Sequence, residues 1–188
     1  MEFNHDVEKC LEILNQGGVI LYPTDTVWGI GCDATNDEAV KKIYEIKNRP
    51  GSKSMIVLLA DERDLLQYVA GTDLAVFDYL DTVHKPTTVI YDGAIGLADS
   101  LVNEDGSIAI RIVKEDFCRH LIKRFRKPIV STSANLSGEP TPANFAGISN
   151  DIIGKMDYVV KYRQDDHSTA APSSVVRWQN GEVTVIRP

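Results

Sequence analysis

The sequence has few cysteines, few histidines and no long apolar run, and each shortage argues against a class of protein. The cysteines, Cys10, Cys32 and Cys118, are three in number and far apart, so their spacing indicates neither a disulfide framework nor a Cys-x-x-Cys redox or metal motif. No apolar run approaches the length that spans a bilayer, and residues 1–6 lack the basic and apolar regions of a secretion signal. We therefore expect a reducing, cytoplasmic location and no membrane contact.

Basic residues are also scarce. Lysine and arginine total 20 against 27 aspartates and glutamates, which gives a formal net charge of -7 and argues against binding nucleic acid by broad neutralisation of its backbone. A local basic cleft is compatible with this charge. The sequence has no Gly-x-Ser-x-Gly elbow and no H-x-x-x-H spacing, and its 4 histidines are scattered. Hydrolase chemistry is therefore disfavoured, and no metal site is indicated.

The length and composition of the chain fit one folded domain over residues 1–188. Hydrophobic residues make up 43% and charged residues 25% of the 188 positions, as in ordinary globular proteins. A domain of this size buries about 70% of the surface that its unfolded chain exposes. A sizeable core is therefore expected without disulfides or a structural metal.

Apolar periodicity predicts helices and strands that alternate early in the chain, with a hairpin at its end. Asn36 is expected to cap a helix that Pro50 and Gly51 end, and Asn180-Gly181 is the strongest short signal for a hairpin turn. The other expected helices are residues 7–14, 61–69, 73–83 and 115–125, and the expected strands are residues 19–23, 55–59, 87–91, 108–113, 128–130, 158–161, 174–178 and 183–187. We therefore expect an α/β domain on a mixed sheet, with antiparallel pairing at its C-terminal end.

The segment Ser131-Thr132-Ser133-Ala134-Asn135 is the strongest candidate for a binding site. It follows an apolar strand that is expected to run out after Val130 into a turn rich in glycine and proline. Three consecutive hydroxyls supply converging donors and acceptors for which a packed core has little use. We expect a polar ligand here, with phosphorylated ligands among the candidates, and we expect Asn135 to brace the turn.

Two further segments combine hydroxyls or cations with turns. Residues 23–29 (PTDTVWG) flank an aspartate with two threonines at a strand end, which suits a polar ligand and equally suits a hydroxyl-capped turn. Residues 47–53 (KNRPGSK) hold three cations, which suits a clamp for a polyphosphate. Cations at the C-terminal end of a helix also favour its dipole without any ligand, so both interpretations stay open.

Two strand segments complete the candidate set. Ser107, Ala109 and Arg111 share one face of an apolar strand. A buried arginine needs a partner, and a structural carboxylate and a substrate carboxylate are equally compatible with the sequence. Residues 172–176 (PSSVV) precede the final hairpin, which carries Arg187 near its end, and these serines suit either a ligand or the loop backbone.

Taken together and in order, these segments resemble those of the threonylcarbamoyl-adenylate synthase family, whose members carry the YrdC-like domain. The resemblance covers nearly the whole chain; the matching segments are residues 17–29, 47–50 (KNRP), 108–111 (IAIR), 133–138 (SANLSG), 172–176 and 187–188. It implies a single domain with a twisted, open mixed sheet and flanking helices, in which the concave face holds the site. It also implies that the second C-terminal domain of longer members is absent.

Members of this family join L-threonine, bicarbonate and ATP into threonylcarbamoyl-AMP and release pyrophosphate, the first step of a tRNA modification beside the anticodon. The resemblance therefore implies a nucleotidyltransferase, L-threonylcarbamoyladenylate synthase. It also implies Mg2+ bound together with ATP and a downstream tRNA-modifying transferase as a partner. An RNA contact is compatible with this assignment.

The resemblance also assigns residues to the two substrates. It implies that the threonine side consists of Thr26, Arg111, Ser131 and Ser173. It implies that the ATP side consists of Lys47, Arg49, Lys53, Ser107, Ser133, Asn135, Thr141 and Arg187. No catalytic nucleophile is expected; Arg49, Lys53 and Arg111 are expected to act by positioning the substrates and neutralising charge.

Two alternatives to the synthase stay open. A maturation factor that binds double-stranded RNA or the ribosome could use the same concave face without catalysis, although the acidic net charge weakens this interpretation. A paralogue could act on a different nucleotide or acceptor. Leu58 stands where family members often have histidine, and His84-Lys85-Pro86 replaces a segment rich in tryptophan, proline and glycine.

Overall fold

Nine strands form one mixed sheet in the computed structural model, which describes residues 1–49 and 55–188. Across the sheet the order is β7-β1-β2-β6-β3-β5-β4-β8-β9. The pairs β1–β7, β3–β5 and β4–β8 are parallel, and the other five pairs are antiparallel. The strands are β1 (Ile20–Tyr22), β2 (Gly29–Gly31), β3 (Ile56–Leu59), β4 (Thr87–Tyr91), β5 (Ile108–Ile112), β6 (Ile129–Ser133), β7 (Tyr158–Val159), β8 (Ser174–Gln179) and β9 (Glu182–Arg187). The expected α/β fold on an open mixed sheet is confirmed.

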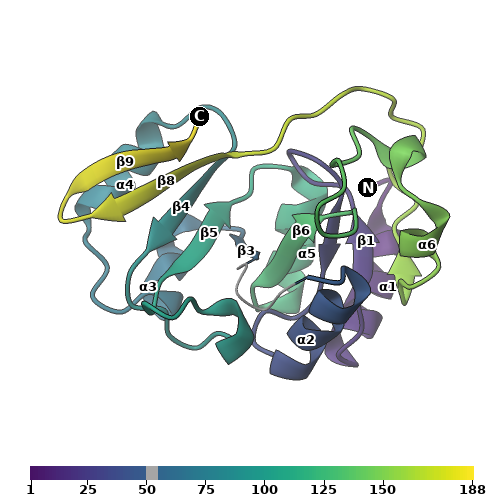
Figure 1. Cartoon of the computed structure of the whole chain (residues 1–188), viewed down its shortest axis with the longest axis horizontal. Coiled ribbons are helices and arrows are strands. Elements are labelled where there is room, and N and C mark those ends of the chain that lie inside the picture. Colours follow the sequence, from purple (N-terminus) through teal and green to yellow (C-terminus); the bar gives the residue numbers. More distant parts are fainter. Residues whose placement is uncertain (50–54) are drawn as a thin grey trace.

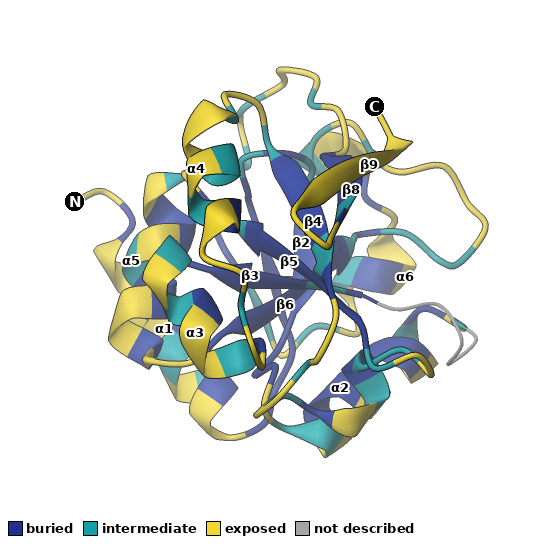
Figure 2. Cartoon of the chain, turned by 90° about the vertical axis from the view of Figure 1, so that its left-hand side faces the viewer, coloured by how far each residue is buried: buried dark blue, intermediate teal, exposed yellow. Residues whose placement is uncertain are grey.

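Helices lie on both sides of this sheet (Figure 1). Figure 2 shows α1, α3, α4 and α5 on one side of the strands, and α2 and α6 toward the other. The helices are α1 (Asn4–Asn15), α2 (Asp37–Ile46), α3 (Leu65–Tyr68), α4 (Ala75–Thr82), α5 (Asp116–Phe125) and α6 (Asn150–Ile153), with 3-10 turns at Glu62–Asp64, Asp99–Leu101 and Phe145–Gly147. The expected helix over residues 61–69 is thus a 3-10 turn followed directly by α3.

The core lies between the sheet and the helices that cover it. Helix α5 buries one apolar face, formed by Phe117, Cys118, Leu121, Ile122 and Phe125, and leaves its charged side chains outside. Strands β1 and β2 are buried along their whole length, as expected for strands that are covered on both faces. Every cysteine is buried and unbridged. Within the described ranges, no helix is both long and apolar enough to cross a membrane.

Two local signals in the sequence are confirmed by the structure. Asn36 Oδ1 accepts a hydrogen bond of 3.1 Å from the backbone N–H of Ala39, and so caps α2. The turn between β8 and β9 places Asn180 at φ 54° and Gly181 at φ 76°. A two-residue turn of this hairpin type requires positive φ at both positions, which asparagine and glycine tolerate best.

Two features of the sheet differ from the expectation. The sequence pattern does not predict β2, because a strand of only three residues that contains two glycines has little β-propensity of its own. Strand β6 also continues to Ser133 instead of ending after Val130, since Ser131 pairs with Ile56 and Ser133 with Gly29. The hydroxyl segment is therefore largely strand. Pro50 and Gly51, expected to end α2, lie outside the described residues.

A substitution at Gly31 tests how closely β2 packs against its neighbours. An added Cβ would overlap the carbonyl oxygen of Val130 and would lie 2.6 Å from Cε1 of Tyr22. Because a paired backbone cannot move aside freely, we expect Gly31→Ala to lower the free energy of unfolding by about 2 kcal/mol. Denaturant unfolding measures this loss. Gly147→Ala is the control, since the nearest atom to its Cβ would be 3.5 Å away. Equal losses in the two variants would contradict the packing argument.

Candidate functional site

A cavity of about 330 Å³ opens on one face of the sheet, across the neighbouring strands β6, β3, β5, β4 and β8. We call it the sheet-face cavity. Residues two apart on a strand point to the same face, and this alternation brings pairs such as Ala109 and Arg111 into the lining. The lining consists of Thr26, Val27, Arg49, Met55, Ile56, Thr88, Ile90, Ala109, Arg111, Ser131, Thr132, Ser133, Thr141, Pro172, Ser173, Val175 and Arg187.

Arg111 is a buried cation in this lining, with 3% of its surface exposed. Oδ1 of Asp25 lies 3.1 Å from its Nη2. The alignment is too poor for a hydrogen bond, and Nε and Nη2 of Arg111 have no hydrogen-bond partner in the part of the chain that the structure describes. Asp25 is therefore a counter-ion that leaves the donor fork unsatisfied. A carboxylate is the best complement to such a fork, because it accepts two parallel N–H bonds.

Several hydroxyls line the same cavity as this arginine. Thr26 and Ser173 are buried, and each has a hydroxyl neighbour, since Thr26 Oγ1 lies 3.0 Å from Oγ1 of Thr24 and Ser173 Oγ lies 2.8 Å from Oγ1 of Thr88. Ser131 contributes a third buried hydroxyl from β6. The structure thus brings together every residue that was expected on the threonine side. That threonine is their ligand stays a prediction at this point.

Two further arginines, Arg49 and Arg187, line the same cavity. Burial lowers the pKa of Arg49, so its cation gains from an anionic partner. Arg187 donates from Nε and Nη2 to the carbonyl oxygen of Ser173, at 3.2 and 2.7 Å, which fixes the end of β9 to the start of β8. With Ser133 and Thr141, these arginines are the residues of the expected ATP side that line the cavity.

Three described residues that were expected on the ATP side, Lys47, Ser107 and Asn135, are not part of the lining. Ser107 donates its hydroxyl proton to Oδ1 of Asp105 at 2.6 Å and accepts from Nδ2 of Asn103 at 2.9 Å. Asn135 donates from Nδ2 to the carbonyl oxygens of Leu136 and Glu139, both at 2.9 Å, so it braces the turn as expected. Lys53 lies outside the described residues.

The position of Lys47 in a segment with three cations suggests a side chain that is open to a phosphate or to solvent. The structure places it in a different environment. Its side chain is completely buried, and Nζ donates to the carbonyl oxygens of Ser133 and Asn135, each at 2.5 Å. Burial and the nearby charge of Arg49 lower its pKa to about 8, so the ammonium form still prevails at neutral pH. The backbone oxygen of Lys47 accepts from the N–H of Ser137 at 2.8 Å. Lys47 therefore ties the end of α2 to the turn after β6.

Sequence reasoning missed two contributors to the site. Thr88 lines the cavity and contacts Ser173, and the pair Thr87-Thr88 at the start of an apolar strand is the signal that could have identified it. Asp25 was noted within its segment without a role. Its pairing with Arg111 joins residues 86 positions apart, which no local pattern indicates.

The fold and the site define an α/β protein whose sheet presents a buried arginine and several hydroxyls to one cavity. A family model described as "Telomere recombination", that of Sua5, YciO and YrdC, matches residues 12–188, and the chain belongs to this family. The resemblance found in the sequence motifs is thereby confirmed.

Relatives agree with this assignment. The threonylcarbamoyl-AMP synthase of Vibrio campbellii (strain ATCC BAA-1116) is 37% identical over 137 residues, which cover 71% of this chain and 74% of that protein. P. abyssi Sua5 complexed with L-threonine has a TM-score of 0.86 at 22% identity, and E. coli YciO has 0.83 at 22%. The match to P. abyssi Sua5 covers 98% of this chain and 54% of that protein, so the chain spans about half its length. The match to E. coli YciO covers 97% of this chain and 88% of that protein. The solved structures confirm the YrdC-like fold.

The contacts of Lys47 predict a large effect on stability. Lys47→Met keeps the length and apolar stem but leaves two carbonyl oxygens without their donor, so we expect a loss of about 3 kcal/mol in the free energy of unfolding. Urea unfolding measures it. Lys42→Met is the control, because Lys42 is exposed and bonds one carbonyl oxygen, that of Gly17. A loss no greater than the control's would show that the buried contacts contribute little.

Proposed function

We propose that this chain is an L-threonylcarbamoyladenylate synthase, a nucleotidyltransferase that forms threonylcarbamoyl-AMP and pyrophosphate from L-threonine, bicarbonate and ATP. The observation that carries the proposal is the unsatisfied donor fork of Arg111 in a hydroxyl-lined cavity. The name of the V. campbellii relative and the L-threonine complex of P. abyssi Sua5 support the same reaction.

Threonine is proposed to bind with its carboxylate on Nε and Nη2 of Arg111. The hydroxyls of Thr26, Ser131 and Ser173 lie in the same lining and supply further donors and acceptors for its polar groups. Asp25 is the counter-ion of this guanidinium, and its Oδ1 forms no hydrogen bond with Nη2. An amino acid is favoured over a simple anion, because the three hydroxyls in the lining offer donors and acceptors beyond those that a carboxylate alone needs.

ATP is proposed to bind with its phosphates near Arg49, Arg187 and Ser133, and Lys53 is proposed to join them. The described lining contains hydroxyls but no carboxylate. This donor set fits Mg2+ that arrives with the nucleotide and keeps several waters, with Ser133 or Thr141 as the protein oxygens available to it. When bound, Mg2+ would neutralise part of the phosphate charge.

The proposed reaction needs no covalent enzyme intermediate. The neutral amine of threonine forms a bond to the carbon of bicarbonate, water leaves, and the product is a carbamate. A carbamate oxygen then attacks the α-phosphorus of ATP while the bond from that phosphorus to the pyrophosphate oxygen breaks. The side chains of this chain hold the reactants in line, and such positioning supplies roughly 7–11 kcal/mol in favourable cases. The reactive mixed anhydride is proposed to pass to a tRNA-modifying transferase.

Pyrophosphate release from ATP by the purified chain tests this function, with L-threonine and bicarbonate omitted in turn. If the chain is the synthase, pyrophosphate release depends on both L-threonine and bicarbonate. Release that is indifferent to threonine would favour a paralogue acting on another acceptor. Absence of release together with salt-sensitive binding of double-stranded RNA would favour a non-catalytic RNA-binding factor.

Arg111→Lys tests the recognition of the carboxylate. Lysine keeps the charge but loses the planar fork, so we expect the KM for threonine to rise about 10- to 100-fold while the KM for ATP changes by less than about threefold. Steady-state kinetics with each substrate varied measure the split. Arg119→Lys, at an exposed position on α5, serves as the control. Equal rises in both KM values would contradict a threonine-specific role.

Arg49→Ala tests the neutralisation of phosphate charge. Because the cation is proposed to stabilise charge that moves onto pyrophosphate in the transition state, we expect kcat to fall about 100-fold or more. Arg119→Ala should retain wild-type turnover. Near-normal kcat in a folded Arg49→Ala protein, verified by its unfolding midpoint, would remove Arg49 from the mechanism.

A further inference from the structure

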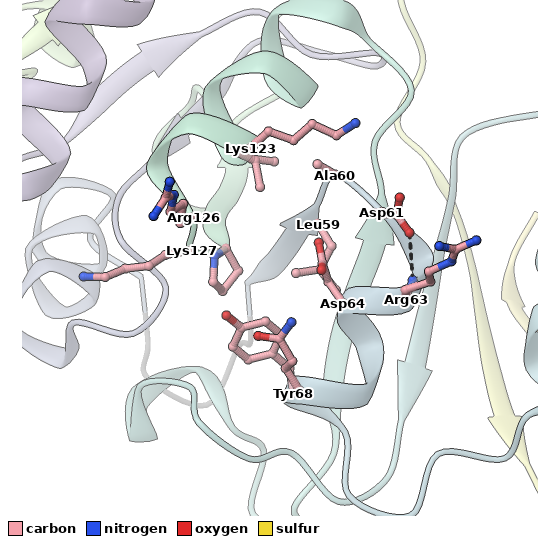
Figure 3. Close-up of a pocket in the computed structure, with 12 residues that line it drawn as sticks. Leu59, Ala60, Asp61, Arg63, Asp64, Tyr68, Lys123, Arg126 and Lys127 are labelled. Carbon is pink, nitrogen blue, oxygen red and sulfur yellow. Dashed lines mark hydrogen bonds between the residues drawn. The ribbon is translucent and has the colours of Figure 1, made fainter.

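A cavity of about 540 Å³ between α3 and the C-terminal end of α5 is larger than the sheet-face cavity. Figure 3 shows that the charged ends of its residues Lys123 and Arg126 point to opposite sides. Both side chains are exposed to solvent, so these cations do not converge on one ligand. In the sheet-face cavity, by contrast, buried hydroxyls contact one another, and their bonds define which of them can accept from a ligand.

Thr24 is buried beside the sheet-face cavity without belonging to its lining, and 2% of its surface is exposed. Its hydroxyl oxygen donates to the carbonyl oxygen of Val27 at 2.8 Å and accepts from the backbone N–H of Thr26 at 3.0 Å. The same oxygen lies 3.0 Å from the hydroxyl oxygen of Thr26, which does line the cavity. Thr24 therefore holds Thr26 through both its backbone and its side chain.

The proton of each hydroxyl can be assigned from these contacts. A hydroxyl has one proton and two lone pairs. The carbonyl oxygen of Val27 can only accept, so the proton of Thr24 is used there, and one lone pair of Thr24 accepts the N–H of Thr26. The contact between the two hydroxyls is then a bond that Thr26 donates into the remaining lone pair. Thr26 Oγ1 consequently presents only lone pairs to a ligand and acts as an acceptor.

The hydroxyl of Ser173 has no such fixed direction. It lies 2.8 Å from Oγ1 of Thr88, and either atom can donate. Among the described residues, no third hydrogen-bond partner of these two hydroxyls determines which one does. Ser173 can therefore donate to a ligand or accept from it, whereas Thr26 is restricted to accepting.

An obligate acceptor suits the amino group of the proposed threonine ligand better than its hydroxyl. A hydroxyl can donate or accept, and so pairs with either kind of partner. The neutral amine must keep its lone pair for attack on bicarbonate, so its N–H groups can only donate. A neutral oxygen also accepts an N–H without favouring the ammonium form, which a carboxylate would do. Asp25, the carboxylate next to Thr26, contacts Arg111 and is not part of the lining.

We propose that Thr24 is a positioning residue, which fixes Thr26 Oγ1 as the acceptor for the amino group of the amino-acid substrate. This agrees with a carboxylate on Arg111, because the amino group is on the carbon that bears the carboxylate, and Thr26 directly follows the counter-ion of Arg111 in sequence. Because threonine is taken as the ligand, this role of Thr24 rests on the proposed function. A residue outside the cavity thus sets which group of the substrate can bind at Thr26.

The test compares the binding of L-threonine with that of two analogues, by equilibrium competition against isotope-labelled L-threonine. (R)-3-hydroxybutyrate lacks the amino group, and L-2-aminobutyrate lacks the hydroxyl. Thr24→Val removes the hydroxyl at nearly unchanged size. We expect it to weaken the binding of both ligands that carry an amino group about tenfold, and that of (R)-3-hydroxybutyrate less than about threefold. Thr24→Ser, which keeps the hydroxyl, should restore the wild-type affinities.

Two further variants separate this role from a general loss of structure. Thr72→Val is the matched control, because Thr72 also donates its hydroxyl proton to a backbone carbonyl oxygen at 2.8 Å, that of Val69, but lies outside the lining. It should leave all affinities unchanged. Thr26→Val removes the acceptor itself and should reproduce the selective loss of ligands that carry an amino group, so it carries the same test if Thr24→Val does not fold.

Equal weakening of all three ligands in the folded variants, or no weakening, would overturn the proposal, because a purely structural role would not distinguish the ligands. Selective weakening of the two ligands that carry a hydroxyl would assign Thr26 to that hydroxyl and would also overturn it. In these cases the wild type still binds L-threonine, so the proposed function stands. Failure of the wild type to bind L-threonine would overturn the proposed function and the role of Thr24 together.

Discussion

The site depends on one buried contact, the ammonium of Lys47 on the carbonyl oxygens of Ser133 and Asn135. This contact joins the end of α2, which leads to Arg49, to the end of β6, which carries Ser131 and Ser133. A second contact between the same segments is the hydrogen bond from the N–H of Ser137 to the backbone oxygen of Lys47. Because a buried ammonium must keep its acceptors, the relative position of the proposed phosphate and threonine subsites is narrowly defined.

Two buried cations illustrate the difference between structure and function in this fold. Lys47 has acceptors from the chain itself and therefore contributes to stability. Arg111 has a counter-ion in Asp25 but donors without a hydrogen-bond partner among the described residues, a costly arrangement that the proposed carboxylate would relieve. The hydrogen-bond state of each side chain, more than its charge or its burial, distinguishes the structural cation from the one that is proposed to bind a ligand.

Much of the fold could be predicted from local signals, whereas the exact site could not. Asn36, Asn180 and Gly181 encode a helix cap and a hairpin turn in their own side-chain and backbone properties, so the sequence predicts them well. Strand β2 exists because its neighbours pair with it, and its glycines carry no such signal. Strand alternation likewise puts Ser107 on the face of Arg111, but a local bond to Asp105 engages its hydroxyl. The periodicity of the sequence predicts neither long-range strand pairing nor a local hydrogen bond that engages a hydroxyl.

The lining of the sheet-face cavity is drawn from positions between Thr26 and Arg187, so no short stretch of the chain contains the site. Such a cavity exists only once the sheet is assembled, and its ligands bind the native state and not the unfolded chain. Ligand occupancy is therefore thermodynamically linked to folding: at 100 times its Kd, a ligand of the native state adds about 2.7 kcal/mol to stability. The proposed substrates, when abundant, would therefore also protect this chain against unfolding and proteolysis.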